Sequence, residues 1–365
     1  MLNLENLLQI ICQNLQIAQP QYTLAKEKYE EIQRKLQRVG SPFSTYNLEI
    51  FPQGSFAIQT TVKPLSREEY DVDLVCLLKD GATASINPMN LLTELKSFLV
   101  KLYGTSNVEL KKRCVCVNFS RQFHLDILPA IPDPLRAGDN LLIPDREIKA
   151  WTSSNPRGYR KWFLKQCERR VLTSSKNESL PRRPSVYTQS PLQNTVQLFK
   201  RWRDIAFKGM NENWQPRSIV LTTLLANAYQ GENTILTTFS SALNDIKQKI
   251  DSHTSPLAVL NPLDSNECFS EKWYEDQEGY FHFRSQLAAL VQDFTSLQNA
   301  TSLTDKKEIL SRLFGESIVN KALTTVAKGI ASPETARNLR VTNTGELTTA
   351  MANTLAVPKH TFYGN

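Results

Sequence analysis

Hydrophobic positions in the first half of the chain change from a helical to a strand-like period and back. Apolar residues recur every three to four positions, then in short runs bounded by Gly, Pro and Ser. The pattern predicts four helices, at 2–18, between Pro20 and Gly40, at 88–103 and from Pro156 to about 170. It predicts strands at 48–51, 70–78, 108–119 and 123–131. This half therefore mixes helices with strands.

The second half follows the helical period alone, and we find no strand pattern in it. The predicted helices cover 192–207, 217–230, 234–250, 284–299 and 303–331. A Ser- and Pro-rich stretch at 172–191 is typical of a connecting loop. We therefore expect a first domain at 1–170, a helical domain at 171–350 and a flexible tail at 351–365.

Composition narrows the class of protein. The 365 residues are 41% hydrophobic and 22% charged, as in ordinary soluble globular proteins. A net charge of +7 suits polyanionic ligands, including nucleoside triphosphates. The six cysteines form no C-x-x-C pair, which favours reduced thiols. No signal peptide and no apolar run of about 18 residues is present, so we expect a cytoplasmic protein without a membrane partner.

Three aspartates stand in strongly apolar strand patterns. Asp71 and Asp73 are two residues apart, so their side chains emerge on one face of a strand. Two adjacent carboxylates repel each other unless a cation lies between them, and Mg2+ prefers such oxygen ligands. Asp126 in the 123–131 strand would be the third carboxylate; the alternative is a structural aspartate paired with an arginine. His124 is interpreted as a packed core histidine.

A Gly-Ser pair precedes the first two aspartates. Gly54 allows the backbone to approach a phosphate closely, and Ser55 offers a hydroxyl and an amide to phosphate oxygens. Gln53 could add a donor. With three carboxylates, the set suits an in-line displacement between two divalent ions about 4 Å apart. The stretch therefore predicts the metal and phosphate site of a nucleotidyltransferase.

The helical half contributes two candidate phosphate ligands, each with an alternative interpretation. Lys200 lies in a helix with apolar neighbours, and Ser218 opens the next helix, where free amides attract anions. Lys200 could instead be a surface lysine whose stem packs on the protein, and Ser218 an ordinary N-cap.

These motifs together resemble the bacterial CD-NTases, relatives of cyclic GMP-AMP synthase and oligoadenylate synthetase in the polymerase-β-like superfamily. The resemblance covers most of the chain. It is carried by Gln-Gly-Ser-Phe-Ala (53–57), Thr-Val-Lys-Pro (61–64), Glu-Tyr-Asp-Val-Asp-Leu-Val (69–75), His-Leu-Asp-Ile-Leu-Pro-Ala (124–130), Leu-Phe-Lys-Arg-Trp (198–202) and Pro-Arg-Ser-Ile-Val-Leu-Thr-Thr-Leu (216–224).

The resemblance implies a bilobed α+β fold, with a mixed-sheet nucleotidyltransferase lobe against a C-terminal helical lobe. It implies that Asp71, Asp73 and Asp126 bind two Mg2+ ions, with Mn2+ as a substitute. Gln53, Gly54, Ser55, Lys200 and Ser218 would contact ATP or another NTP. The implied enzyme joins two or three NTPs into a cyclic second messenger for anti-phage defence (CBASS), releasing pyrophosphate.

The resemblance also implies regulators encoded in the same operon, of the ubiquitin-transferase-like or HORMA type, acting on the C-terminal tail. No Cys and His cluster resembles the zinc insertion of the animal DNA sensor, which argues against double-stranded DNA sensing by that route. Two alternatives remain open: a nucleotidyltransferase that modifies tRNA, a protein or a small molecule, and a catalytically silent binding module. Base identity, ring size and linkage do not follow from the sequence.

Overall fold

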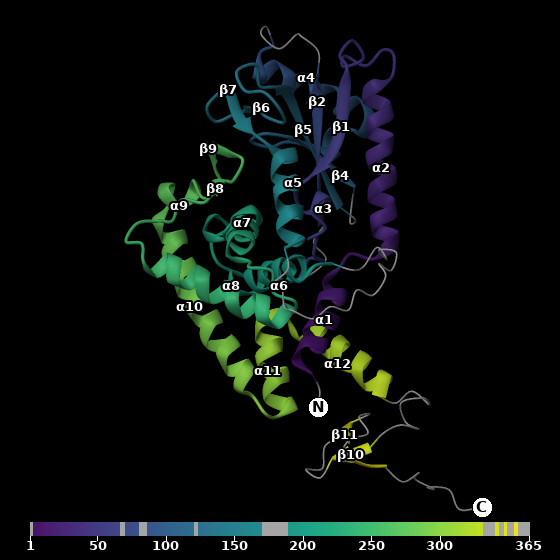
Figure 1. Cartoon of the computed structure of the whole chain (residues 1–365). Helices are drawn as coiled ribbons and strands as arrows, with labels where there is room; N and C mark the ends of the chain where they lie inside the picture. The colour runs from purple at the N-terminus through teal and green to yellow at the C-terminus, as the bar shows by residue number, and fades with distance from the viewer. Residues whose placement is uncertain are drawn as a thin grey trace, which may run out of the picture. The chain divides into compact units, whose positions relative to one another are not determined.

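The computed structural model describes residues 3–65, 70–79, 86–119, 123–169 and 189–330, and three short strands beyond them (Figure 1). Two compact units are present. Residues 15–292 make up the larger, and residues 1–14 with 293–365 the smaller. A domain boundary at 170 stays a prediction. No helix in the described ranges is long and apolar enough to cross a membrane.

The elements follow one another in an order that mixes both types up to residue 154 and is mainly helical afterwards. They are α1 (Leu4–Leu15), α2 (Gln19–Gln37), β1 (Leu48–Gln53), α3 (Gly54–Ala57), β2 (Tyr70–Leu78), α4 (Pro88–Tyr103), β3 (Val108–Leu110), β4 (Val115–Phe119), β5 (Phe123–Pro132), β6 (Leu141–Asp145), β7 (Ala150–Ser154), α5 (Pro156–Cys167), α6 (Pro191–Ala206), α7 (Ser218–Ala228), α8 (Ile235–Asp251), β8 (Leu260–Asn261), β9 (Asp264–Cys268), α9 (Lys272–Glu275), α10 (Gln277–Asn299), α11 (Leu303–Phe314), α12 (Glu316–Ile330), β10 (Arg340–Thr342), β11 (Leu347–Thr348) and β12 (Thr354–Ala356), with short 3-10 turns at Thr105–Asn107 and Glu212–Trp214.

The larger unit is built on a mixed seven-stranded sheet, as expected. Its strand order is β1-β2-β5-β4-β3, and β6 joins the end of β5 and pairs with β7. The central pair β2 and β5 is parallel, whereas β1 and β4 run antiparallel to their neighbours. The register sets Asp73 of β2 beside Asp126 of β5 and beside Gln53 of β1.

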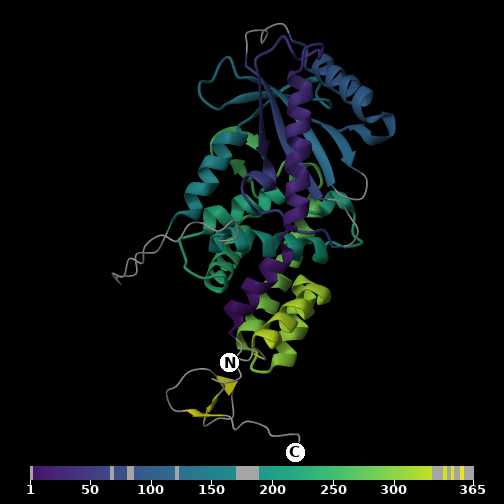
Figure 2. The same ribbon diagram turned by 90° about the vertical axis from the view of Figure 1, so that its right-hand side faces the viewer.

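The two faces of this sheet differ in chemistry. Even-numbered β2 residues such as Val72 and Leu74 are buried in a large core with leucines of α4 and apolar residues of α2. Figure 2 shows α2 running along the sheet. The odd-numbered residues Asp71, Asp73 and Val75 face the other way, because side chains alternate along a strand. The large core therefore fixes the strand, and the opposite face presents the carboxylates.

The helical part of the larger unit is joined to the segment after α3 by side chains of α6. Ser190 is the N-cap of that helix and forms a capping box with Gln193, in which the two residues exchange hydrogen bonds. Gln193 also donates to the carbonyl of Ile58 (3.0 Å), and Gln197 donates to that of Thr61 (2.9 Å). These contacts bring α6 to the predicted phosphate loop.

Four sequence-based expectations differ from the structure. The 108–119 strand is interrupted by a turn and forms β3 and β4, and the pair β6 and β7 was not predicted. The predicted 303–331 helix is two helices. The first ends at Phe314, because the φ of +95° at Gly315 does not occur in a right-handed helix, and the second is α12. The second half contains strands after all, notably the β8–β9 hairpin. Within the expected 351–365 tail only β12 is described; the other residues lie outside the described part.

Candidate active site

Two aspartates of β2 and one of β5 lie on one face at the centre of the sheet. Asp71 is exposed and Asp73 half-buried. Because β2 and β5 are parallel neighbours and Asp126 is in register with Asp73, all three carboxylates belong to the same face. The structure therefore brings the three predicted carboxylates together.

Burial and the neighbouring carboxylates make the two aspartates of β2 weaker acids. Burial and the nearby Asp126 and Asp71 carboxylates raise the pKa of Asp73 to about 7. Partial burial and Asp126 also raise the pKa of Asp71. A divalent cation would relieve this repulsion, so the donor set fits Mg2+ chemically. Among the described residues, however, no three His, Cys, Asp or Glu side chains already form an arrangement that could hold a metal ion.

A lysine explains the position of the third carboxylate. Lys111, in the turn between β3 and β4, donates to both Asp126 oxygens at 3.0 and 2.9 Å. This ion pair compensates the charge of Asp126, much as the alternative interpretation of a structural aspartate envisaged, with lysine in place of arginine. Asp126 would have to exchange Lys111 for a cation in order to bind metal.

His124 is not the core histidine that we expected. Its side chain is 32% exposed, and its Nδ1 lies 3.5 Å from Oδ1 of Asp71. The register explains this position, because His124 is opposite Asp71 across the parallel β2–β5 pair. The alternation of His124 and Asp126 along the strand predicted their shared face, but not the contact with Asp71 on the neighbouring strand.

The Gly54-Ser55 pair opens the short helix α3 directly after β1. Gly54 has a φ of +60°, and a Cβ there would lie 2.2 Å from Oδ2 of Asp73. Only glycine allows this close approach. Ser55 contacts Thr61 through its hydroxyl (3.2 Å), and its carbonyl accepts from the amide of Thr60 (2.9 Å). Gln53, the last residue of β1, completes the group beside Asp73.

Lys200 and Ser218 come from α6 and α7. Lys200 is 3% exposed, so its interpretation as a surface lysine is wrong. Its Nζ donates to the carbonyl and hydroxyl of Thr60 (both 3.0 Å), and burial lowers its pKa to about 7. Ser218 is not an N-cap either, because Arg217 holds that position. The Ser218 hydroxyl accepts a hydrogen bond from Nη1 of Arg203 (2.6 Å).

Two cavities meet at these residues. One, of about 420 Å3, is lined by Gln53, Gly54 and Asp73, and extends to α5, α7 and β9. The other, of about 830 Å3, extends along the end of α6 to residues 207–215. Four residues line both cavities: Ser55, Asp71, Lys200 and Ser218. Each cavity has the size of a small-molecule site.

The sequence did not point to several residues in the first cavity. Arg113, Arg217, Asn261 and Glu267 all line it, alongside Asn155, which caps α5. The Lys-Lys-Arg run at 111–113 could have indicated Arg113. No sequence pattern pointed to Asn261 or Glu267. Two arginines near the start of α5 differ in their contacts. Arg160 lines the cavity, whereas Arg157 pairs with Glu49 and stacks on Phe51.

A carboxylate-bearing parallel strand pair, a glycine-serine turn and a helical wall define a nucleotidyltransferase. Residues 2–166 match the model of the Second Messenger Oligonucleotide or Dinucleotide Synthetase domain. This match and the relatives below confirm the resemblance to the bacterial CD-NTases that the motifs indicate.

Individual relatives match along most of the chain. The c-di-GMP synthase of Roseivirga ehrenbergii is 29% identical over 369 residues, covering 99% of this chain and 97% of the relative. Among solved structures, the CD-NTase CdnG of Bradyrhizobium diazoefficiens in complex with GTP has a TM-score of 0.74 at 22% identity, covering 89% of this chain and 99% of that one. The E. coli CdnC:HORMA-deltaN complex has a TM-score of 0.59 at 13% identity, covering 83% and 94%. The expected fold is confirmed.

Proposed function

We propose that this protein is a cyclic oligonucleotide synthase that joins two or three NTPs with release of pyrophosphate. One observation carries the proposal: two cavities of nucleotide size meet at Ser55, Asp71, Lys200 and Ser218. An enzyme that joins two nucleotides must hold both at one reacting centre, and this arrangement provides for it. Relatives known as a c-di-GMP synthase and a cyclic dinucleotide synthase support the same reaction.

The carboxylates would hold two Mg2+ ions, or Mn2+ in their place. Asp71 and Asp73 carry raised pKa values that a cation would lower again, and Asp126 would join them after release of Lys111. Bound divalent ions supply charge stabilisation to the attacking and leaving oxygens of an in-line displacement. Asp126 would help to remove the proton from the attacking hydroxyl.

The triphosphate would lie against the Gly54–Ser55 turn and the helical wall. The missing side chain of Gly54 leaves room beside Asp73, and Ser55 and Gln53 offer donors to phosphate oxygens. Lys200, on the opposite wall, carries a pKa lowered to about 7 by burial. A triphosphate beside it would stabilise the charged ammonium, so binding and protonation of Lys200 would be coupled. Ser218 would contribute its hydroxyl or its amide.

We further propose that the product is a second messenger of anti-phage defence. The relative from Roseivirga ehrenbergii is named for c-di-GMP, which makes a cyclic dinucleotide containing guanine the first product to test. Regulation through a HORMA or ubiquitin-transferase-like partner would act on residues 358–365, which lie outside the described part. A pull-down in which the protein truncated at 357 still engages its operon partners normally would remove that part of the proposal.

The reaction can be tested with purified protein. Incubation with all four NTPs and Mg2+ or Mn2+, followed by phosphatase and mass spectrometry, should yield a phosphatase-resistant cyclic product. The same incubation with Asp73→Asn should yield almost none. Label transferred from an NTP to tRNA, protein or a small acceptor would instead identify the alternative nucleotidyltransferase.

A further inference from the structure

One wall of the smaller cavity carries a carboxylate and an amide that the proposed chemistry does not use. Both belong to the β8–β9 hairpin. Glu267 and Asn261 line the cavity together, and Nδ2 of Asn261 donates to Oε2 of Glu267 at 2.7 Å. The other oxygen, Oε1, accepts from the hydroxyl of Ser154 at 3.3 Å. Asn261 is itself buried, with its Oδ1 accepting from the amide of Leu263.

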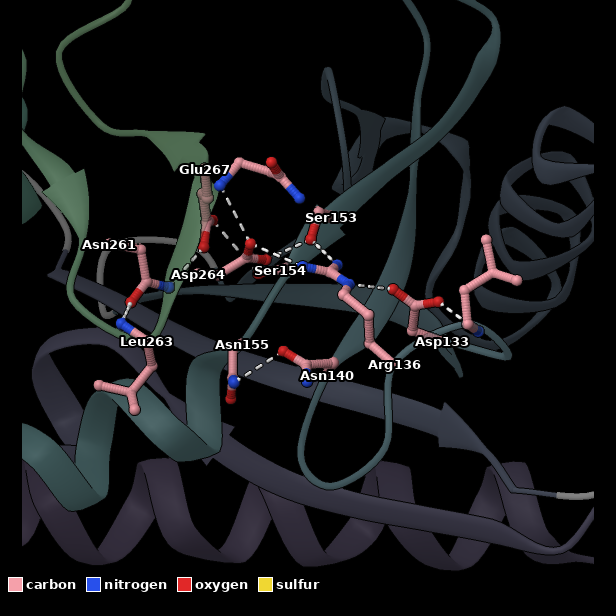
Figure 3. Close-up of polar contacts among 12 residues, drawn as sticks. Asp133, Arg136, Asn140, Ser153, Ser154, Asn155, Asn261, Leu263, Asp264 and Glu267 are labelled. Atoms are coloured by element: carbon pink, nitrogen blue, oxygen red, sulfur yellow. Dashed lines mark hydrogen bonds and ion pairs between the residues drawn. The ribbon is translucent and has the colours of Figure 1, made fainter.

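A second set of contacts holds the hairpin against the turn after β5 and against β7 (Figure 3). Arg136, in the turn after β5, donates through Nη1 to Oδ1 of Asp264 (2.7 Å) and through Nε to Oδ2 of Asp133 (2.6 Å). Ser153 of β7 contacts both Arg136 and Asp264. Asp264 is buried, and both of its carboxylate oxygens accept hydrogen bonds. These contacts to the sheet fix the hairpin and with it the position of Glu267. A side chain that recognises a ligand requires such a fixed position.

Glu267 retains capacity for a ligand. A carboxylate has about four acceptor positions, and the protein contacts described above use one on each oxygen. Burial raises the pKa of Glu267, so additional donors to the ionised carboxylate would be favourable. The same cavity is also lined by the apolar residues Ile58, Ile219 and Phe269, which suit the faces of a planar ring.

We propose that Glu267 selects guanine at this cavity, with Asn261 as its positioning residue. The inference rests on the proposed function, because it assigns the base of an NTP whose phosphates lie toward Asp73. Guanine presents two adjacent donors, N1–H and N2–H, that match the two oxygens of one carboxylate. Adenine presents only one donor there, beside the N1 acceptor, and uracil flanks its single N–H with two carbonyls. A carboxylate repels these acceptor atoms, so the site discriminates against both bases.

The decisive substitution is Glu267→Gln. The amide keeps the shape of the side chain but replaces one acceptor by a donor, which opposes guanine and complements the donor–acceptor edge of adenine. We expect kcat/KM for GTP to fall about 10- to 100-fold, while that for ATP is unchanged or rises. Glu278→Gln, which removes an exposed carboxylate at the start of α10, is the matched control and should leave both values unchanged. An unchanged GTP to ATP ratio in Glu267→Gln would overturn the proposal.

Glu267→Asp is the second variant, for the case that the glutamine variant does not fold. Shortening the side chain keeps its charge but withdraws it from the base, so it should lose guanine preference without gaining adenine preference. Melting temperatures of all variants identify loss of fold.

Equilibrium binding of non-hydrolysable GTP and ATP analogues separates this proposal from the proposed function. Guanine preference that Glu267→Gln abolishes, in a protein that forms no cyclic product, would support the base assignment and overturn the synthase. Cyclic product formed with the base preference intact in Glu267→Gln would do the opposite.

Discussion

The two walls of the smaller cavity were assembled in different ways. One wall is formed by residues of β1, α3 and β2, which are consecutive elements of the chain. The other consists of the β8–β9 hairpin, which is more than 180 positions away from Asp73 in the sequence and reaches the sheet through Arg136. The first wall carries the groups to which we assign the phosphoryl chemistry. The second carries the groups that we assign to the choice of base, so chemistry and selectivity can be altered separately.

The largest effect is expected from Asp73→Asn, which acts on the first wall alone. Loss of one carboxylate removes a ligand for the proposed cations and the charge that attracts them. We expect synthesis of the cyclic product to fall by about 1,000-fold, at the upper end for the loss of one charge-stabilising group. Product formation by mass spectrometry measures it. Base preference in the residual activity should be unchanged if the two walls act independently.

Asp251→Asn is the control. That carboxylate lies at the end of α8, pairs with Lys247 and Arg284 and does not line either cavity. Wild-type activity in Asp73→Asn would remove the metal assignment of this strand.

Gly54→Ala should have the next largest effect. The added methyl group would lie 2.2 Å from Oδ2 of Asp73, at a backbone φ of +60° that disfavours alanine. Displacement of Asp73 should lower kcat/KM by about 100-fold, because catalytic groups tolerate misplacement poorly. Steady-state kinetics with a circular dichroism spectrum would separate this from unfolding.

Gly40→Ala is the matched control, since Gly40 has a φ of +91°, open space around its Cβ position and no place in the lining of either cavity. Equal losses of activity in both variants would mean that backbone strain, and not contact with Asp73, is responsible.

The same contrast explains what the sequence could predict. Asp71 and Asp73 share a face because of strand alternation alone, and the apolar stretch around Asp126 predicted its strand. The β8–β9 hairpin has two short, polar strands that carry no hydrophobic alternation, and its place depends on the Arg136–Asp264 contact between distant segments. The pairing of Lys111 with Asp126 and the burial of Lys200 likewise depend on tertiary contacts. Local periodicity contains none of this information.

Arg136→Ala tests how firmly the second wall is held. Its loss leaves the buried Asp264 carboxylate with two hydrogen-bond partners among the described residues, the Ser153 hydroxyl and the amide of Asn266. Breaking a buried ion pair costs several kcal/mol, and the remaining hydrogen bonds reduce this to about 2 kcal/mol. Chemical denaturation should show that loss of stability, and the preference for GTP should decrease.

Arg312→Ala provides the comparison, because Arg312 pairs with Asp293 at the surface and should cost at most about 1 kcal/mol. Equal destabilisation by both variants would show that the hairpin contact has no special weight.

The smallest effect concerns the pH dependence of stability without metal. The pKa of Asp73 is raised from 3.8 to about 7, so between these values the folded protein binds more protons than the unfolded chain. The free energy of unfolding should therefore fall as pH rises from 4 to 7, by about 1 kcal/mol because water reaches the half-buried carboxylate. Denaturation in EDTA at pH 5 and pH 8 measures this loss. Asp73→Asn should flatten the profile, and Mg2+ should restore stability to the wild type mainly at pH 8. A wild-type profile that is flat in EDTA would mean that burial and the neighbouring carboxylates do not raise the pKa of Asp73 in the folded protein.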